Sequence, residues 1–228
     1  MNRTFVLGDI HGAHKALLQC FDRCAFDLEK DHLICLGDVT DGWPETRACI
    51  DELLKVKNLV YLLGNHDFWA MAWMTTGYAE DIWLQQGGEA TVKSYQEGVP
   101  RSHVLFLESA KPYYVLNNRL FVHAGIDPQL KIEQQDLHTF IWDRNLARAA
   151  LDLYVKDIQG KITSYEEVYV GHTPIPFGKP IQSCEIWLMD TGAGWSGTLS
   201  MMDIHSKEVF MSDPVPSLYP DVEGRKRK

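Results

Sequence analysis

The sequence has no excess of basic charge, no long apolar run and no paired cysteine motif. Its 22 lysine and arginine residues against 31 aspartate and glutamate residues give a net charge of −9, which disfavours broad binding to nucleic acid or to an anionic membrane. No apolar run approaches the roughly 20 residues that cross a bilayer, and residues 1–12 contain no secretory apolar region. We therefore expect a cytoplasmic protein with neither a nucleic-acid partner nor a membrane partner.

The five cysteines are odd in number and include no C-x-x-C pair, as is typical of reduced thiols in the cytosol. Hydrophobic residues make up 45% and charged residues 23% of the 228 residues, as in ordinary globular proteins. The chain is long enough to bury a sizeable core. We predict one domain over residues 1–212, followed by a proline-rich and basic tail over residues 213–228.

The first third of the chain alternates strand-like with helix-like segments, which is typical of the α/β class and of a parallel sheet. We predict these strands and helices, in order, at residues 4–7, 13–24, 32–36, 44–56 and 58–63. A glycine follows each strand at once, at Gly8, Gly37 and Gly64. The three loops should therefore lie together at the carboxyl edge of the sheet, where ligands bind.

The remainder of the chain divides into a helical and a strand-rich part. Residues 67–110 predict a mostly helical insert, and a hairpin should turn at Asn117 and Asn118. A helix is expected near residues 133–152. Short strands are expected in the segments EVYVGHTP, EIWLMDTGAG, GTLSMMDI and EVFM.

Side chains able to bind a metal stand where the apolar runs end. Asp9 and His11 are two residues apart, so both point the same way from an extended backbone, although an aspartate after a glycine is also a common turn or cap residue. At the ends of the other apolar runs lie residues with an oxygen or imidazole group, namely Asp38, Asn65, His123 and His172. A mixed nitrogen and oxygen set favours manganese, iron or zinc over calcium. Six ligands with a bridging carboxylate would serve two ions, an arrangement used for displacement at phosphorus.

His66 lies beside one of these candidates, and Asp41 lies three residues beyond another. A histidine and aspartate paired next to a metal would form an oriented proton donor. Asp41 could instead cap a helix that begins near Pro44.

The motifs GDIHG, GDVTDG, GNHD, HAG and GHTP, in this order and spacing, resemble the phosphoprotein phosphatase branch of the calcineurin-like metallophosphoesterases. The later segments FIWDR and DTGAGWSGTL resemble further signatures of that family, and its bacterial and phage serine/threonine phosphatases are the most similar in motif set. The resemblance implies a central two-layer β sandwich flanked by helices. It also implies two divalent metal ions, with Mn²⁺ expected and iron or zinc as alternatives.

Carried over by position, the resemblance assigns six metal ligands. Asp9 and His11 would hold the first ion, Asp38 would bridge, and the second ion would be held by Asn65, His123 and His172. His66 matches the general acid of the family and Asp41 its orienting partner. Arg144 in FIWDR matches the arginine that grips the substrate phosphate, and Asn65 is also expected to contact substrate.

Two positions depart from the family pattern. Gly42 stands where an arginine usually follows the second aspartate of the GDxxDRG motif, so one phosphate clamp is missing or is supplied from elsewhere, for instance by Arg47. Asp67 stands where many protein phosphatases of the family have glutamate, and diadenosine tetraphosphate hydrolases often have the aspartate.

The function that we expect is a phosphomonoester hydrolase of the protein serine/threonine phosphatase type, acting on a phosphorylated protein or peptide or on a small phosphate ester. The alternatives are a dinucleoside polyphosphate hydrolase and a catalytically silent phosphate-binding module. Four aromatic residues bear on the substrate, either as a wall for a base or a peptide or simply as core: Phe68, Trp69, Trp73 and Trp83. The four-residue spacing of Trp69 and Trp73 makes core packing the safer interpretation.

Overall fold

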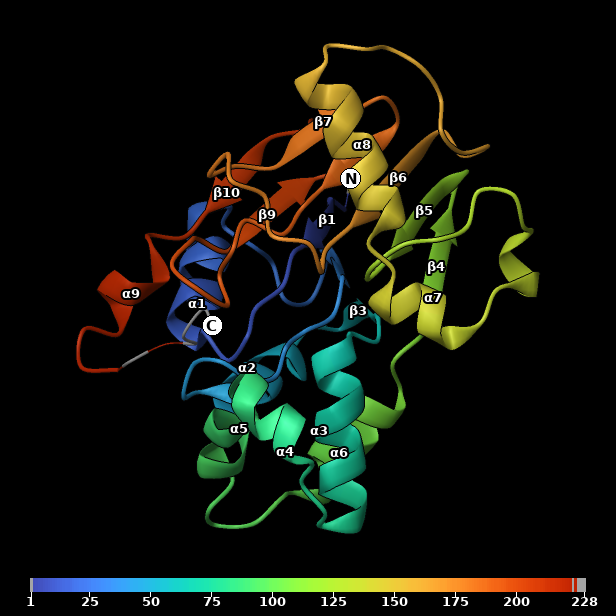
Figure 1. Cartoon of the computed structure of the whole chain (residues 1–228). Helices are drawn as coiled ribbons and strands as arrows, with labels where there is room; N and C mark the ends of the chain where they lie inside the picture. Colours follow the sequence, from blue (N-terminus) through green and yellow to red (C-terminus); the bar gives the residue numbers. More distant parts are fainter. Residues whose placement is uncertain (1, 223, 225–228) are drawn as a thin grey trace.

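The computed structural model describes residues 2–222 and residue 224. Two five-stranded sheets form its centre, with helices against the outer face of each (Figure 1). The first sheet has the order β10-β9-β1-β2-β3 and comprises β1 (Thr4–Leu7), β2 (His32–Cys35), β3 (Asn58–Tyr61), β9 (Ser200–Asp203) and β10 (Val209–Met211). The second has the order β4-β5-β6-β8-β7 and comprises β4 (Tyr113–Leu116), β5 (Arg119–Val122), β6 (Glu167–Val170), β7 (Ile181–Ser183) and β8 (Ile186–Leu188).

Side-chain alternation along the strands explains why the two sheets pack face to face. In β1, Phe5 and Leu7 join the core beneath the helices, whereas Val6 belongs to the core between the sheets. In β5, Phe121 reaches that central core, where it stacks on Tyr169 with ring centroids 4.7 Å apart. β1 and β5 thus bury side chains on both faces, as strands inside a layered α/β fold do. The predicted two-layer sandwich flanked by helices is confirmed.

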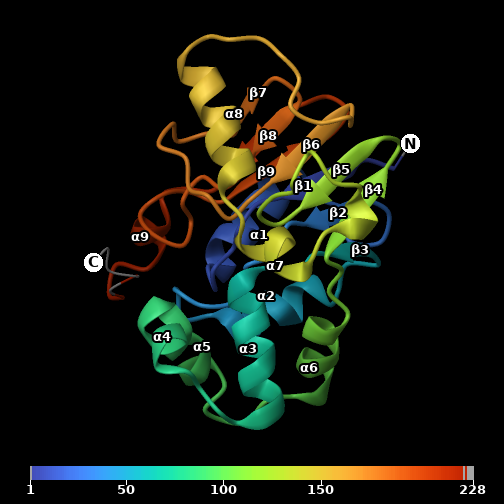
Figure 2. The same cartoon turned by 45° about the vertical axis from the view of Figure 1, so that its right-hand side comes forward.

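Helices cover the outer faces of the sandwich. α1 (His14–Arg23) and α2 (Thr46–Leu53) were predicted between the first strands, and both are confirmed with shorter ends than expected. The insert is helical as predicted but begins two residues earlier, with α3 (Asn65–Thr76), α4 (Asp81–Trp83), a π-type turn η1 (Leu84–Gly88), α5 (Glu89–Ser94) and α6 (Arg101–Glu108). Figure 2 shows these helices below the sheets as one group.

The helix predicted near residues 133–152 is wrong as one element. The chain forms a 3₁₀ turn η2 (Ile132–Gln134), then α7 (Leu137–Trp142), and then α8 (Asn145–Val155). Asp143 leaves the helical conformation, with ψ 139°. Its Oδ2 accepts a hydrogen bond of 3.0 Å from the backbone N–H of Asn145. A short aspartate side chain that bonds the backbone ahead of it favours this break over a continuous helix. Strand β7 was not predicted.

Parallel pairing brings the functional loops to one edge. Leu7 pairs with Cys35 and Cys35 with Tyr61, so β1, β2 and β3 end in register. In the second sheet Val122 pairs with Val170, so β5 and β6 also end together. The loops that follow these five strands carry the candidate ligands.

The described part of the C-terminal segment packs on the domain. α9 (Val215–Leu218) contacts α1, and Tyr219 stacks on Trp43 with centroids 5.2 Å apart. The four basic residues 225–228 lie outside the described residues, and the division at residue 212 stays a prediction. Among the described residues, no helix has both the length and the apolar character needed to cross a bilayer.

Candidate metal centre

Two histidines from the second sheet face one another beyond their strands. Nε2 of His123 lies 3.2 Å from Nδ1 of His172. Nδ1 of His123 lies 2.9 Å from the carbonyl oxygen of Leu36, which only accepts, so Nδ1 carries the proton and Nε2 presents a lone pair. Burial lowers the pKa of His123, and it lowers the pKa of His172 to about 2. The lowered pKa values favour the neutral ring, which is the form in which imidazole binds a metal.

Oxygen atoms from the first sheet meet these rings. Oδ1 of Asn65 lies 3.2 Å and Oδ1 of Asp38 lies 3.5 Å from Nε2 of His123. Burial opposes ionisation of Asp38, but the surrounding histidine rings lower the pKa of its carboxyl below the usual range. Asp38 is therefore an ionised carboxylate. Two clusters of possible metal ligands share it, His11 with His66 and His123 with His172.

The first loop supplies Asp9 and His11, and both side chains are buried. Nδ1 of His11 lies 3.2 Å from the carbonyl oxygen of Thr40, which leaves Nε2 to face the shared carboxylate at 3.6 Å. Oδ2 of Asp9 accepts a hydrogen bond of 2.9 Å from the backbone N–H of His172. Burial raises the pKa of Asp9, and the nearby carboxylate of Asp190 adds to the increase. The structure thus brings all six predicted ligands to one edge of the sandwich.

Among the described residues, the buried polar atoms without a hydrogen-bond partner include two atoms of candidate ligands, Oδ1 of Asp9 and Nε2 of His172. Nε2 of His123 and Oδ1 of Asn65 add lone pairs that face each other without a donor between them. Buried acceptors of this kind are costly unless a cation binds them. The mixed donor set fits divalent ions of the manganese, iron or zinc type, and the shared Asp38 fits two of them.

The site backbone is held in an unusual conformation. Four candidate residues have a positive φ, at 53° for His11, 49° for Asp38, 73° for Asp41 and 61° for His172. Residues other than glycine adopt this region at a cost of about 1–3 kcal/mol each, and such strain gathers at functional sites. The loops therefore present these side chains at the expense of backbone stability.

Three glycines leave room for the ligands. A Cβ on Gly64 would lie 2.1 Å from Oδ1 of Asp38, and a Cβ on Gly171 would lie 2.1 Å from Oδ1 of Asp9. A Cβ on Gly194 would lie 2.4 Å from Cδ2 of His11. The glycine of GNHD and the glycine of GHTP thus serve close packing against carboxylates.

His66 and Asp41 form a direct pair, with Nδ1 of His66 2.6 Å from Oδ2 of Asp41. Trp83 Nε1 donates to the same oxygen over 2.7 Å, and Thr91 Oγ1 donates to Oδ1 over 2.7 Å. Asp41 does not cap the next helix, because α2 has Glu45 at its N-cap and no side-chain cap bond. No pattern in the sequence pointed to Thr91, which lies 50 residues from Asp41.

Arg144 reaches the same edge from the break between α7 and α8. Its Nη1 donates to the carbonyl oxygen of His172 over 2.8 Å and lies 3.3 Å from Oγ1 of Thr173. Burial lowers the pKa of its guanidinium, and the carboxylate of Asp190 opposes that shift. Asp190 was not among the predicted residues, although it ends the apolar run EIWLMD just as the other candidates end theirs.

Gly42 and Asp67, the two positions that depart from the family pattern, each make backbone hydrogen bonds. Gly42 has φ 86°, a conformation that favours glycine, and its N–H donates to the carbonyl oxygen of Gly87 over 3.1 Å. The guanidinium of Arg47, proposed as a substitute clamp, lies 3.6 Å from Glu97 at the helical insert. Asp67 accepts backbone hydrogen bonds from Val39 over 2.9 Å and Thr40 over 3.1 Å, which ties the loop after β2 to α3.

The aromatic residues divide between the two interpretations. Trp73 packs within the insert, with its ring 5.7 Å from that of Trp83 and 6.2 Å from that of Tyr95. Trp69 instead lies beside the site, with its ring 5.6 Å from that of His66 and 4.8 Å from that of Trp142. Trp73 and Trp83 are therefore core residues, whereas Trp69 packs partly on the core and partly beside the site.

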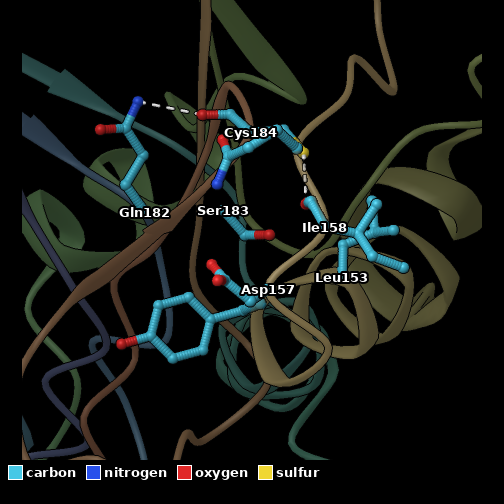
Figure 3. A pocket seen from close by; sticks show the side chains of 8 residues that line it. Leu153, Asp157, Ile158, Gln182, Ser183 and Cys184 are labelled. Atoms are coloured by element: carbon cyan, nitrogen blue, oxygen red, sulfur yellow. Dashed lines mark hydrogen bonds between the residues drawn. The ribbon is translucent and has the colours of Figure 1, made fainter.

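A cavity of about 600 Å³ lies elsewhere, beside the C-terminal end of α8 (Figure 3). Leu153 and Ile158 line it on one side, and Gln182, Ser183 and Cys184 line it on the other. At 1.5 Å per residue, this end of α8 lies about 15 Å from the end that adjoins Arg144. The cavity is thus separate from the metal centre.

Known proteins that resemble this chain belong to one family of phosphoesterases. The family model described as calcineurin-like phosphoesterase matches residues 3–200. Serine/threonine-protein phosphatase 1 of Salmonella typhimurium is 26% identical over 209 residues, which cover 88% of this chain and 91% of that protein. The symmetrical bis(5'-nucleosyl)-tetraphosphatase of Pseudomonas fluorescens is 32% identical over 158 residues, which cover 65% of this chain and 54% of that protein.

The fold has solved relatives. The structure of a provisionally assigned diadenosine tetraphosphatase superposes with a TM-score of 0.68 at 16% identity, over 93% of each chain. At this identity the likeness supports the fold alone.

Proposed function

Because the chain belongs to the calcineurin-like phosphoesterase family, we propose that it is a phosphomonoester hydrolase of the protein serine/threonine phosphatase type. The observation that carries the proposal is the Asp38 carboxylate, which is shared by two pairs of histidine rings that could hold a metal, His11 with His66 and His123 with His172. Beside them lies an oriented pair of His66 and Asp41. A metal pair and a proton donor side by side are what hydrolysis of an ester at phosphorus needs.

We assign the metal ligands as the family resemblance implies. Asp9 and His11 would hold one ion, Asp38 would contribute to both, and Asn65, His123 and His172 would hold the other. When bound, two such ions lower the pKa of a water and neutralise charge on the phosphoryl oxygens. Manganese is the ion that we expect, with iron or zinc as alternatives, because the donors are imidazoles, carboxylates and an amide and include no thiolate.

His66 acts as the proton donor to the leaving oxygen. The Asp41 carboxylate at 2.6 Å accepts the proton on Nδ1, which leaves Nε2 to exchange a proton with substrate. His66 is also within ligand range of His11 and Asp38. Its bond to Asp41 and the supply of six other ligands favour the proton-transfer role.

Arg144 and Asn65 bind the substrate phosphate. The guanidinium of Arg144 is half-buried and is held by the carbonyl oxygen of His172, so it is fixed beside the metal ligands. A fixed guanidinium forms charge-assisted hydrogen bonds to a phosphoryl group and opposes the charge that develops on it. Asn65 adds a side-chain amide next to the same ring pair.

The substrate that we propose is a phosphorylated protein or peptide. The match to the Salmonella phosphatase spans 91% of that protein, whereas the chain spans about half of the tetraphosphatase, 54%. A dinucleoside polyphosphate remains the second candidate, because Asp67 of GNHD is the residue that the resemblance associates with those hydrolases. Only one feature favours a catalytically silent phosphate-binding module, namely Gly42 in the place of the usual arginine.

We place the protein in the cytoplasm. None of the five cysteines is paired, and four of them are buried. Reduced, buried thiols suit that compartment.

The test is phosphate release by metal-stripped protein, titrated with Mn²⁺ and given a phosphothreonine peptide, diadenosine tetraphosphate and p-nitrophenyl phosphate in parallel. Manganese-dependent release from the peptide supports the proposal. Cleavage of the dinucleotide alone moves the activity to the second candidate. No turnover of any of the three overturns the enzyme assignment.

A further inference from the structure

The C-terminal segment returns to the region of the metal centre and is held there at two points. Tyr219, directly after α9, stacks on Trp43 with ring centroids 5.2 Å apart, and its hydroxyl accepts a hydrogen bond of 3.0 Å from the backbone N–H of Lys15. Gly224 lies on the same indole, because a Cβ added there would lie 2.8 Å from Cη2 of Trp43. The ring of Trp43 is only 1% exposed. The segment therefore covers Trp43 as far as Gly224.

Trp43 is in turn joined to a candidate metal ligand. Its backbone N–H donates to the carbonyl oxygen of His11 over 2.9 Å. Its indole Nε1 donates to the carbonyl oxygen of Ala193 over 2.7 Å. The next residue, Gly194, lies against the imidazole of His11, since a Cβ there would lie 2.4 Å from Cδ2. Gly224 is thus separated from the ring of His11 by one indole and one loop.

Trp43 also directly follows Gly42, which stands where the family pattern has a phosphate-gripping arginine. Glycine offers no side chain for that purpose. Arg144 reaches the site through the carbonyl oxygen of His172, whereas the guanidinium of Arg47 lies 3.6 Å from Glu97 at the helical insert. A cation for the place of the usual arginine therefore has to come from another segment that passes beside Trp43.

The residues that follow Gly224 are all basic. We call them the basic segment, and they are Arg225, Lys226, Arg227 and Lys228. They lie outside the described residues, but four residues can span at most about 13 Å, and their long side chains extend that reach.

The charge of the site complements that of the basic segment. Four carboxylate residues are buried at the site edge, namely Asp9, Asp38, Asp41 and Asp190. The chain as a whole carries a net charge of −9. An acidic region attracts a cationic segment that is anchored at its rim, and a phosphate group that enters the region needs cations around it. The place of the anchor and the charge of the segment therefore favour the same location.

We propose that a guanidinium of the basic segment, from Arg225 or Arg227, grips the substrate phosphate in place of the arginine that is missing at Gly42. A guanidinium suits this task better than an ammonium group, because its planar fork donates to two phosphoryl oxygens at once. This inference rests on the proposed function and adds to it a phosphate-binding cation besides Arg144. The C-terminal segment is then part of the substrate site.

The test uses the full chain with two double variants that remove equal charge from the same segment. They are Arg225→Gln with Arg227→Gln, and Lys226→Gln with Lys228→Gln as the matched control. Neither changes Gly224 or Tyr219, so the segment keeps its anchor. We expect the arginine variant to raise KM for p-nitrophenyl phosphate by about ten- to a hundredfold, as loss of charge-assisted hydrogen bonds implies. The lysine variant should raise it at most by a factor of about three.

A third variant separates the shape of the group from its charge. Arg225→Lys with Arg227→Lys keeps both charges but loses the planar fork, so its KM should lie between the values of the wild type and the arginine-to-glutamine variant. A KM equal to that of the wild type would overturn the guanidinium clamp. All three variants should bind as many Mn²⁺ ions as the wild type, since none changes a metal ligand.

A binding readout keeps the inference independent of turnover. Calorimetric titration of the metal-loaded proteins with inorganic phosphate should show a higher Kd for the arginine-to-glutamine variant and nearly the wild-type Kd for the lysine variant. Equal changes in these two variants would overturn the clamp and leave the proposed function intact. A lower KM in the arginine-to-glutamine variant would also overturn it, because the segment would then obstruct the site. Absence of turnover by the wild type on every substrate would overturn the proposed function instead, and the phosphate titration would still decide the clamp.

Discussion

The Asp41 carboxylate lies 2.6 Å from Nδ1 of His66, and both side chains are buried. Asp41 is itself fixed by hydrogen bonds from Trp83 and Thr91 in the helical insert. The insert thus reaches into the site through one carboxylate. The orientation of the proton donor depends on residues that lie up to 50 positions away from Asp41.

His66→Asn should bind two metal ions like the wild type yet lose activity according to the leaving group. General acid catalysis contributes about 10²- to 10⁴-fold, and a poor leaving group needs the proton most. We expect a loss in this range on a phosphothreonine peptide and a much smaller loss on p-nitrophenyl phosphate, measured as kcat. Equal losses on the two substrates would remove the general-acid assignment.

Thr91→Val should reproduce part of that pattern without touching a ligand. It keeps the volume of the side chain but removes a 2.7 Å hydrogen bond to Asp41. We expect a moderate loss of kcat on the peptide, smaller than that of His66→Asn, with unchanged metal content by elemental analysis. A variant as active as the wild type on the peptide would show that the insert does not orient the pair.

Gly64→Ala should weaken metal binding although position 64 has an ordinary φ of −89°. The new methyl would lie 2.1 Å from Oδ1 and 2.3 Å from the backbone nitrogen of Asp38, so the shared ligand must move. We expect Mn²⁺ affinity to fall by about tenfold or more, as overpacking against a fixed group costs about 1–3 kcal/mol. Gly160→Ala is the control, because a Cβ there meets no atom within 4 Å. Equal affinities in the two variants would contradict the close packing.

Ala25→Gly should stabilise the fold. Ala25 directly follows Cys24, the C-cap of α1, and has φ 47°, where an L-residue is strained and glycine is not. We expect the free energy of unfolding to rise by about 1 kcal/mol in a urea titration. Ala149→Gly, on the exposed face of α8, should lower it by about 1 kcal/mol. Changes of the same sign at the two positions would refute the conformational explanation.

Glu167 should make stability depend on pH at acidic values. Burial alone would raise the pKa of its carboxyl, but hydrogen bonds from Lys207, Arg119 and Tyr169 lower the pKa below the ordinary value of 4.5. A carboxyl with a lowered pKa in the folded state adds stability above the unfolded-state pKa, and this stability is lost as the pH falls through the folded-state pKa. Glu167→Gln should therefore be less stable than the wild type at pH 7, and the gap should narrow below about pH 4.5. Glu108→Gln, at an exposed position of α6, is the control and should differ little from the wild type in stability. A stability difference at Glu167 that stays constant with pH would contradict the assignment.

Much of the architecture was predictable because it depends on local patterns. Strands that end on glycine, such as Leu7 before Gly8, predicted both the parallel sheet and the edge at which the loops meet. Side chains that follow those strands, such as His123 and His172, then had to lie close together. Because parallel strands pair in register, the residues that follow them lie at the same edge of the sheet. These predictions therefore needed no knowledge of side-chain contacts.

The remainder depended on contacts between distant segments. Asp143 breaks the predicted helix by bonding the backbone ahead of it, and this break gives Arg144 its place. Trp83 looked like core and is buried, yet its indole N–H binds Asp41. Trp69 and Trp142 belong to helices that meet only in the folded molecule. No periodicity in the sequence reports which ring of a half-buried tryptophan meets another.

The most direct test of the account is the stoichiometry of Mn²⁺ binding to metal-stripped protein, measured by calorimetric titration of the wild type and of Asp38→Asn. The wild type should bind two ions per chain. The variant should bind both ions more weakly, because Asp38 belongs to both ligand clusters. A single ion in the wild type, or two ions bound equally well by Asp38→Asn, would rule out a dinuclear centre that shares Asp38.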